Sequence, residues 1–570
     1  LYSDPDNPLA LPETVLPKGG IYDLTEYSLT SMDLRATVAY NADLGKTGDH
    51  ILNLFAGSEL NSTDRQAIWF RGWGYQYNNG GIPYVDYRLF KQSQEEGTDY
   101  YSNSFQYLRN LAFFGMATYS YKGRYTINGT LRYEGSNMLG KSRQARWLPT
   151  WNVSGSWNAH EENWWAPTFG KAWTYASLKA SYSLTADRGP ASNSLAVFQS
   201  FTPWRPSTSA NESAIILAAL ENSELTYEKK HELNIGVALG FVDNRINVEF
   251  DWYRRNNFDL IGYTQTMGVG GVTTKLANDA TMESTGCEFT ISTVNIKNKD
   301  FKWTTDWIFG WAENTITKLD SRSQVYSLVN GVGRTEGRPI GALYSIPFAG
   351  LTEEGLPTFF IDAEHTQVVG PGNYAAIYFQ EYENIDYLKY EGTIDPKITG
   401  SFGNTFSWKG LKLNVFFTYS FGNVLRLDNL CPVYSSDYSD LTASMKEMKN
   451  RWMVPGDENV TTIPSIPTVR QMREIDALSN AYSAYNYSTE RVAKGDFIRL
   501  KELSLAYDLP KKYFEGQNAV SSFGVKLSAT NLWLAYADKK LNGRDPEYYN
   551  TGGVSSPVPR QFTLTVKLGF

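Results

Sequence analysis

The residues of this chain that could bind phosphate lie in Gly135-Ser-Asn-Met-Leu-Gly-Lys-Ser142, which matches the P-loop pattern letter for letter. In that motif the backbone amides of a following helix cradle the phosphate, so a helix must begin directly after the lysine. Here Pro149 follows seven residues after Ser142, and the residues beyond it alternate like a strand. The context of the motif therefore argues against nucleotide binding.

Metal and hydrolytic chemistry have no clear signature in the chain. Its four histidines are His50, His160, His231 and His365. They form neither HExxH nor another zinc-ligand spacing, and no GxSxG elbow is present. Acid-rich segments at 4–6, 362–364 and 437–440 could hold calcium through oxygens, but they lack the ligand order of a calcium loop, so solvated carboxylates explain them better. We expect no enzyme activity and no cofactor, with loop calcium as a weak alternative.

Aromatic side chains are the strongest candidates for ligand contact. They make up 15% of the chain, with 38 Tyr and 16 Trp. The Gly- and Asn-rich segment Asn61–Tyr107 reads as a long loop and concentrates them. Sugars and peptides both stack on aromatic faces, although such rings also pack within their own loop or against a partner protein. The candidate substrate-binding residues are Trp69, Trp73, Tyr75, Tyr77, Tyr84 and Tyr87.

The elements that would position these rings are β-strands. At the C-terminus, Phe562, Leu564, Val566, Leu568 and Phe570 share one parity, which gives a strand one apolar face and one polar face. The pattern recurs about 15 times along the chain. The predicted strands are Leu29–Ala42, His50–Leu60, Leu111–Tyr121, Tyr125–Glu134, Pro149–Ala159, Thr174–Thr185, Glu228–Phe241, Ile246–Trp252, Thr285–Ile296, Phe301–Ile316, Lys397–Trp408, Leu411–Asn423, Asp496–Leu509, Phe523–Leu534 and Gln561–Phe570.

The connections between these strands alternate in length. The short ones are Asp43–Asp49, Lys122-Gly123, Val242–Arg245, Lys297–Asp300 and Lys409-Gly410, and the long ones are Asn61–Tyr107, Ala186–Tyr227, Lys318–Asp395 and Arg426–Gly495. Short turns at one rim and long loops at the other are typical of an outer-membrane barrel, whereas a sandwich or propeller has no reason for this order. Leu441–Met453 has helical spacing and predicts a helix inside an outer loop.

The predicted fold is therefore all-β, a transmembrane antiparallel β-barrel. The polar parity would face the lumen and the apolar parity the lipid, with Tyr121, Tyr125 and Trp252 suited to interface girdles. An odd count of strands leaves an open edge, which is not viable in hydrocarbon, so other strands must complete the barrel. A net charge of −7 with both signs interspersed argues against nucleic acid as a partner.

The C-terminal third of the chain resembles a known family. Gly495–Pro510 (GDFIRLKELSLAYDLP) looks like a signature of the SusC/RagA family of TonB-dependent outer-membrane transporters. Asn531-Leu532 with Gly543–Glu547, and the ending from Pro557, resemble the closing motifs of that family. Earlier segments that fit it are Tyr119–Tyr125, Leu131–Ser136, Leu225–Lys229, Asn234–Gly236 and Gly337–Gly341. The resemblance covers essentially the whole chain.

The resemblance implies a 22-stranded barrel with about 15 of its strands in this chain. Residues 1–570 would be the C-terminal part of the barrel, and the TonB box, the plug and the first barrel strands would not be in this chain, which opens at Leu1 without Met or a signal peptide. It further implies a bacterial outer-membrane location and active import of oligosaccharides or, in some members, oligopeptides. The implied partners are a SusD-like surface lipoprotein that caps the long loops, TonB acting through the absent N-terminal region, membrane lipid, and a dimer of SusC–SusD-like pairs.

Two other classes of protein remain open from the residues alone. A passive porin-like channel would share the strands, but the loops here are far longer than the ~12–15 residues that are usual without a function, which favours a gated receptor. A soluble carbohydrate-binding β protein would also show alternation, and it would be extracted without detergent. Aromatic loops mildly favour glycan over peptide.

Overall fold

The computed structural model describes residues 19–45, 48–81, 88–89, 93, 99–170, 172–190, 194–201, 214–268, 271–430, 446–510, 513–514, 520–549 and 559–570. A single antiparallel sheet of 15 strands dominates it, which confirms the strand count predicted from alternation. In pairing order the strands are β1 (Gly20–Leu44), β2 (His50–Tyr75), β3 (Tyr101–Tyr121), β4 (Tyr125–Ser136), β5 (Trp147–Asn158), β6 (Trp173–Asp187), β9 (Glu228–Phe241), β10 (Ile246–Gln265), β11 (Thr274–Lys297), β12 (Phe301–Leu319), β18 (Ile398–Trp408), β19 (Leu411–Phe421), β22 (Phe497–Asp508), β23 (Ser522–Ala537) and β24 (Gln561–Gly569).

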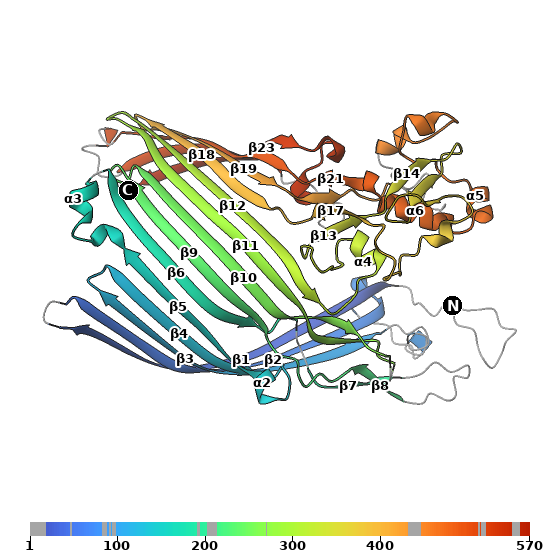
Figure 1. The fold of residues 1–570 in the computed structure, drawn as a ribbon, viewed down its shortest axis with the longest axis horizontal. Coiled ribbons are helices and arrows are strands. Elements are labelled where there is room, and N and C mark those ends of the chain that lie inside the picture. Colours follow the sequence, from blue (N-terminus) through green and yellow to red (C-terminus); the bar gives the residue numbers. More distant parts are fainter. Residues whose placement is uncertain are drawn as a thin grey trace.

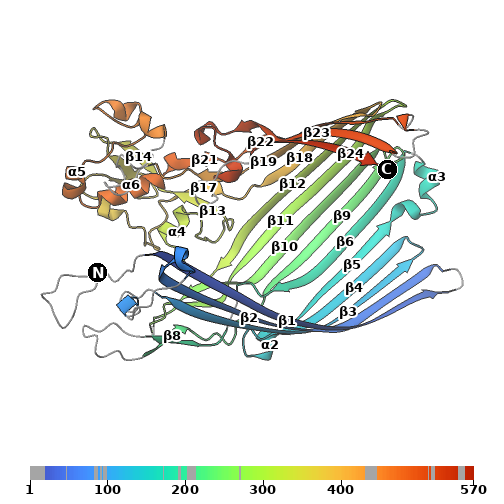
Figure 2. The ribbon, with the colours of Figure 1, turned by 180° about the vertical axis from the view of Figure 1, so that it is seen from behind.

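The sheet curves into an open trough whose free edges are β1 and β24 (Figures 1 and 2). Each strand pairs with its neighbours along the chain, apart from short elements set into the long connections. The remaining strands are β7 (Val197–Phe201), β8 (Ala214–Ala219), β13 (Ala342–Ser345), β14 (Phe348–Leu351), β15 (Pro357–Phe360), β16 (Val368–Val369), β17 (Lys389–Thr393), β20 (Val424–Arg426) and β21 (Val492–Lys494). The α-helices are α2 (Arg143–Arg146), α3 (Trp165–Phe169), α4 (Val325–Val329), α5 (Val469–Glu474) and α6 (Leu478–Asn486).

The two kinds of connection lie at opposite rims of the sheet, as the sequence predicts. Figure 1 places the short turns and α3 at one end and the elaborated connections with α4 to α6 at the other. The turn between β3 and β4 depends on its backbone conformation: Lys122 and Gly123 both adopt positive φ, at 54° and 66°, and the Arg124 N–H donates to the Tyr121 carbonyl at 3.0 Å. We call these two ends the short-turn rim and the outer rim.

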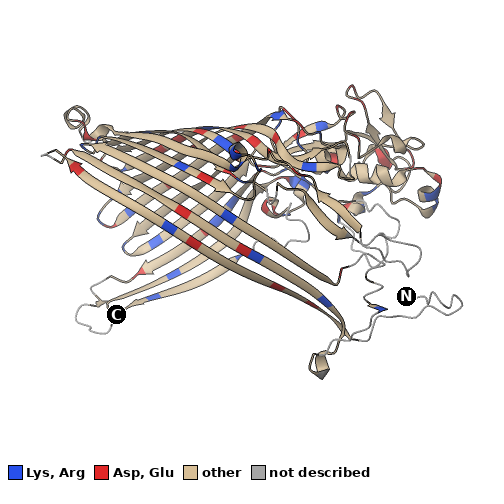
Figure 3. Ribbon diagram, turned by 90° about the horizontal axis from the view of Figure 1, so that it is seen from below, with Lys and Arg blue, Asp and Glu red and all other residues tan. Residues whose placement is uncertain are grey.

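The register assigns every strand residue to one of two faces. In β2 the polar face carries Asn53, Glu59 and Asn61, and cross-strand pairing extends it through the sheet. Ion pairs span this polar face, since Arg132 contacts Glu59 at 3.6 Å and Glu134 at 2.5 Å. Figure 3 shows charges of both signs spread along the strands. The polar face is therefore suited to enclosing water.

The opposite, apolar face has no second layer of protein over it. Val38 is 72% exposed, Leu131 56% and Leu564 67%, although each lies within a paired strand. Leaving such a row in water forfeits about 25 cal/mol for each Å² of apolar surface that could be buried. The alternation therefore indicates that lipid covers this face and that water covers the other.

Several strands extend further toward the outer rim than predicted. β1 begins at Gly20 rather than Leu29, and β2 continues to Tyr75 rather than ending at Leu60. The predicted loop Asn61–Tyr107 is therefore wrong at both ends, because β3 begins at Tyr101. Beyond the hydrocarbon both faces meet water, so the apolar parity stops while the hydrogen-bonded ladder continues.

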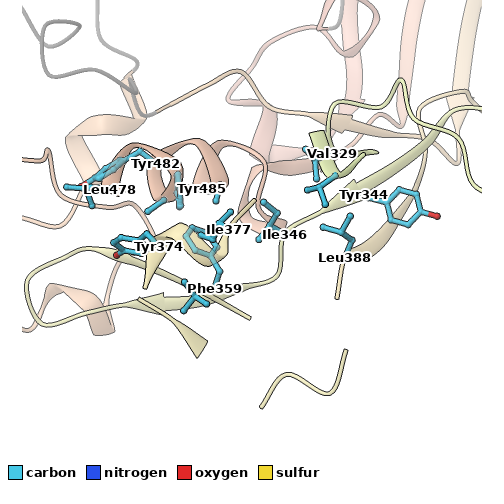
Figure 4. Close-up of a cluster of buried hydrophobic side chains, with 14 of the residues drawn as sticks. Val329, Tyr344, Ile346, Phe359, Tyr374, Ile377, Leu388, Leu478, Tyr482 and Tyr485 are labelled. Carbon is cyan, nitrogen blue, oxygen red and sulfur yellow. The ribbon is translucent and has the colours of Figure 1, made fainter. Parts of the chain in front are cut away.

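Two long connections fold together into an outer module, which comprises residues 320–397 and 422–430 with 446–496. Its core contains Phe359 and Tyr374 from the first connection and Leu478, Tyr482 and Tyr485 from the second, all 2% exposed or less. Figure 4 shows these side chains meeting between α6 and the small strands. These two connections therefore form one packed body at the outer rim.

The helix predicted over Leu441–Met453 is not found in the part of it that the structure describes. Residues 441–445 lie outside the described residues, and Lys446–Asn450 forms a single short 3-10 helix. Met448 is buried in the core of the outer module, so its apolar spacing reflects local packing. Among the described residues, no helix combines the length and hydropathy needed to cross a bilayer.

The two faces predict opposite responses to a buried charge. Leu131→Arg, on the apolar face of β4, should lower the free energy of unfolding in lipid by about 2–4 kcal/mol, because the guanidinium would lie in hydrocarbon. Thr130→Arg, its neighbour on the polar face, should cost much less. Urea titration of the full-length protein in vesicles measures both, and equal losses would contradict the assignment of faces.

Candidate functional site

The candidate site lies on the polar face of β2, near the outer rim. Trp69 and Trp73 continue the row that begins with Asn53 and Glu59, without a register shift between them. Trp69 lies about 60 Å along the strand from His50, at about 3.3 Å per residue, which exceeds the thickness of a bilayer core even for a tilted strand. The two indoles therefore face the vestibule above the membrane.

The neighbours of Trp69 are small on both sides. Its cross-strand partners are Thr25 in β1 and Ser102 in β3. Arg71 lies over the indole of Trp69, with its guanidinium carbon 5.4 Å from the ring centroid, and Asp23 holds Arg71 through two hydrogen bonds of 2.7 and 2.8 Å. The ring is thus fixed in orientation and combines an apolar surface with adjacent polar groups.

A β-bulge separates Tyr75 from the two tryptophans. The register shifts between Gly20 and Ile21, and Gly74 adopts φ +68°, which leaves it as the extra residue. Tyr75 therefore turns to the opposite face, where its ring stacks on Tyr22 with centroids 4.7 Å apart. Tyr77 packs edge-on against Tyr75 and donates to the Ile21 carbonyl at 3.0 Å.

Of the six predicted residues, the structure thus keeps Trp69 and Trp73 on one face of β2, with Arg71 between them, and moves Tyr75 and Tyr77 to another face. Tyr84 and Tyr87 lie outside the described residues. Sequence reasoning missed Tyr27, which shares the face of Trp69 and is 79% exposed. Its signal was the alternation of Thr25 and Tyr27 with Glu26 and Ser28, just before the first predicted strand, which begins at Leu29.

Two motifs of the family signature meet in a buried ion pair. Arg499, from the segment Gly495–Pro510, is 3% exposed and contacts Asp545 and Glu547, the latter at 2.9 Å. Asp545 is itself buried and accepts the backbone N–H of Glu547 at 3.1 Å. The pair ties β22 to the connection between β23 and β24. Arg499, Asp545 and Glu547 therefore have a structural role in holding these two segments together, rather than a role in ligand contact.

A second buried arginine joins the parts of the outer module. Arg426 donates to the carbonyls of Ser488 at 2.9 Å, Val329 at 3.2 Å and Tyr344 at 2.5 Å. Burial lowers the pKa of Arg426 to about 10, partly offset by the attraction of Glu391, so it stays charged at neutral pH. One cation therefore satisfies carbonyls from three separate segments.

The P-loop-like segment is occupied by contacts of its own. Lys141 pairs with Glu221 at 2.9 Å, and a Cβ on Gly140 would lie 2.1 Å from the Ser223 carbonyl oxygen. Ser142 caps α2, a helix of four residues that leads straight into β5. The glycine is thus explained by close packing, and the lysine by an ion pair.

Metal ligation finds no support in the described part of the chain, where no group of three or more His, Cys, Asp or Glu side chains could hold an ion. Asp362 instead accepts the N–H groups of Thr366 and Gln367 at 2.9 and 2.7 Å. These hydrogen bonds hold the pKa of Asp362 below its usual value. The segments 4–6 and 437–440 lie outside the described residues.

Known proteins with similar sequences are named TonB-dependent receptors. No family model matches the chain. Curated relatives include TonB-dependent receptor P3 of Formosa agariphila, 26% identical over 493 residues (80% of this chain, 45% of the relative), and TonB-dependent receptor SusC of Bacteroides thetaiotaomicron, 27% identical over 214 residues (37% and 21%). TonB-dependent receptor P26 of Formosa agariphila is 23% identical and covers 97% of this chain.

Solved structures agree with the curated relatives. The structure of the RagAB peptide transporter superposes with a TM-score of 0.74 at 21% identity, over 96% of this chain and 56% of that one. The RagAB peptide importer in its open-open state gives 0.75 at 20% identity, over 97% and 57%. The chain is therefore similar to the barrels of SusC/RagA-like TonB-dependent transporters. It spans about half the length of the curated relatives it matches.

The SusC/RagA-like barrel belongs in the bacterial outer membrane, with its apolar face in lipid. Its relatives are receptors and transporters rather than enzymes. Within the SusC/RagA-like barrel, Trp69 and Trp73 lie on the face that lines the lumen, above the hydrocarbon.

The buried ion pair gives a test of the structural role assigned to the signature motif. Arg499→Ala should lower the free energy of unfolding by about 3–5 kcal/mol, because it leaves Asp545 buried without a counter-charge. Arg544→Ala removes a neighbouring but half-exposed pair with Asp428 and should cost about 1 kcal/mol or less. Urea unfolding in detergent compares them, and similar losses would refute a special role for Arg499.

Proposed function

We propose that this chain forms the wall and outer vestibule of a TonB-dependent importer, and that the imported cargo is an oligosaccharide. Its curated relatives are named TonB-dependent receptors, SusC among them. The observation that carries the cargo assignment is the pair of indoles, Trp69 and Trp73, on the lumen face at the mouth. Sugar rings present apolar C–H faces that stack on indoles, while their hydroxyls reach nearby polar groups.

The wall below the mouth suits passage rather than capture. On its lumen face, Thr126, Asn128, Ser154, Ser156 and Asn234 line one shallow pocket. Hydroxyl and amide groups offer a sugar many replaceable hydrogen bonds, each worth only about 0.5–1.5 kcal/mol net. No bond is made or broken in this scheme, and the driving energy comes from TonB through a region outside this chain.

The rest of the assembly follows from the open edges. Among the described residues, β1 and β24 each pair with one strand only, and hydrocarbon does not tolerate the row of unpaired backbone groups that such an edge presents. Resemblance to the SusC/RagA family implies a barrel of 22 strands, so we propose that residues 1–570 are its C-terminal part and that earlier strands, a plug and a TonB box complete it. A SusD-like lipoprotein would close over the outer module as a lid, and two such pairs would form a dimer.

Oligopeptide import is the second candidate function. The solved transporter with the same fold, RagAB, is a peptide transporter. Arg71 and Asp23, beside the indoles, could also recognise peptide groups. Both cargo classes use the same mouth, so one set of variants distinguishes them.

Removing either indole should weaken uptake. Trp69→Ala and Trp73→Ala should each reduce the uptake of labelled oligosaccharides about 2–10-fold, because each loses a stacking interaction worth about 0.5–1.5 kcal/mol. Tyr77→Ala, an exposed ring on the opposite face, is the matched control and should leave uptake unchanged. Cells that express the full transporter with its lipoprotein provide the assay.

Three outcomes of this assay would count against the proposal. Loss of oligopeptide uptake, with no glycan uptake in the parent, would move the cargo to peptides. Wild-type uptake in both tryptophan variants would remove the indoles from the site. Steady solute leakage from liposomes containing the intact complex would indicate a passive channel.

A further inference from the structure

A second group of aromatic rings lies at the short-turn rim, in the connection between β5 and β6. Most connections at this rim are turns of a few residues, whereas residues 159–172 contain α3. Figure 1 shows α3 beside the ends of β5 and β6 at this rim, far from the outer module. A tight turn would suffice to join two adjacent strands, so the added helix calls for its own explanation.

The helix packs on the apolar-face side of the wall. Trp165 is 5% exposed, and its indole N–H donates to the Trp173 carbonyl at 2.8 Å. Phe169 lies 4.7 Å from Trp165 and 5.0 Å from Trp173, between ring centroids. The cluster also includes Trp157 and Leu239, which share the apolar parity of β5 and β9. These contacts make α3 continuous with the face that meets lipid.

The acidic residue nearest the helix is tied back toward the turn. The Glu162 carboxylate accepts from Tyr125 Oη at 2.5 Å and from Trp157 Nε1 at 3.3 Å, and it pairs with Arg124 at 3.2 Å. Its charge is therefore matched within the protein. The side chain of Glu161 is 57% exposed and pairs with His160 at 3.4 Å, on the N-terminal side of Trp164. Residues 165–169 of α3 themselves carry no charge.

The outward side of α3 is uncharged and exposed. Trp164 is 49% exposed, and Ala166, Pro167 and Thr168 are exposed beside it. An indole with an apolar ring and one N–H is the side chain most suited to the boundary between headgroups and acyl chains. Short apolar segments rich in Trp and Phe lie in that boundary with their rings among the first carbons of the chains.

We propose that α3 is a phospholipid-binding anchor, in which Trp164 and the Ala166–Thr168 surface insert at the headgroup–acyl boundary of the leaflet on the short-turn side. The occupant is lipid because the surface continues the lipid-facing row of the wall through Trp157, Leu239 and Trp173. The anchor fixes the height of this rim in the bilayer. This role is independent of the cargo and of the assembly proposed above.

A spin label at position 164 tests the anchor. In the full-length transporter with Cys287→Ser and Cys431→Ser, Trp164→Cys would carry the label after reconstitution into phosphatidylcholine–phosphatidylglycerol vesicles. The ratio of collision rates with oxygen and with a nickel chelate reports depth. Leu131→Cys supplies the hydrocarbon reference, and Val332→Cys, 70% exposed in the outer module, supplies the water reference.

The label at position 164 should give a ratio between the two references. A ratio equal to that of Val332→Cys would place α3 in water, and low collision rates with both reagents would indicate cover by protein. A ratio equal to that of Leu131→Cys would place α3 deep in hydrocarbon. Each of these three results overturns the proposal. If Trp164→Cys does not fold, the label at the exposed Thr168 through Thr168→Cys carries the same expectation.

Discussion

A polypeptide wall between hydrocarbon and water must satisfy its backbone hydrogen bonds within itself, and this constraint governs the rest of the structure. The chain meets it with one antiparallel sheet in which each interior strand pairs on both sides. Because the sheet has a single layer, each strand must also be apolar on one face and polar on the other. Function is then left to the face that lines the lumen and to the connections at the outer rim.

The same constraint loosens where the lipid ends. Above the hydrocarbon the strands need only the hydrogen bonds to their neighbours, and neither face has to be apolar. The upper part of β2 can therefore carry Trp69, Arg71 and Trp73 on the lumen face in place of short polar side chains. A strand holds these rings in a more defined geometry than a loop would. The bulge at Gly74 then turns the next aromatic residue, Tyr75, to the other face, where it packs with Tyr22.

The outer module is stabilised differently from the wall, by an apolar core of its own. It lies in water and has its own apolar core, around Tyr374 and Tyr482, with Arg426 bonded to three carbonyls inside it. Separating this buried cation from its partners would lower the free energy of unfolding, because a buried charge without compensating groups strongly destabilises the folded state. The module can therefore present a stable surface to whatever closes the vestibule, while the wall beneath it stays unchanged.

The sequence by itself determined the number of strands, their two faces, the short turns and the separation of the rims. Each of these follows from lipid on one face, which imposes a period of two that is visible in any single strand such as Gln561–Gly569. Resemblance to the SusC/RagA family was also visible there, in Gly495–Pro510. Only the tertiary structure decided that β2 continues through Trp69 and Trp73, because the apolar parity that marks a membrane-spanning strand ends where water meets both faces. It alone decided that Arg499 meets Asp545, since contacts between segments 46 residues apart depend on how β22 and the β23–β24 connection fold together and leave no local pattern.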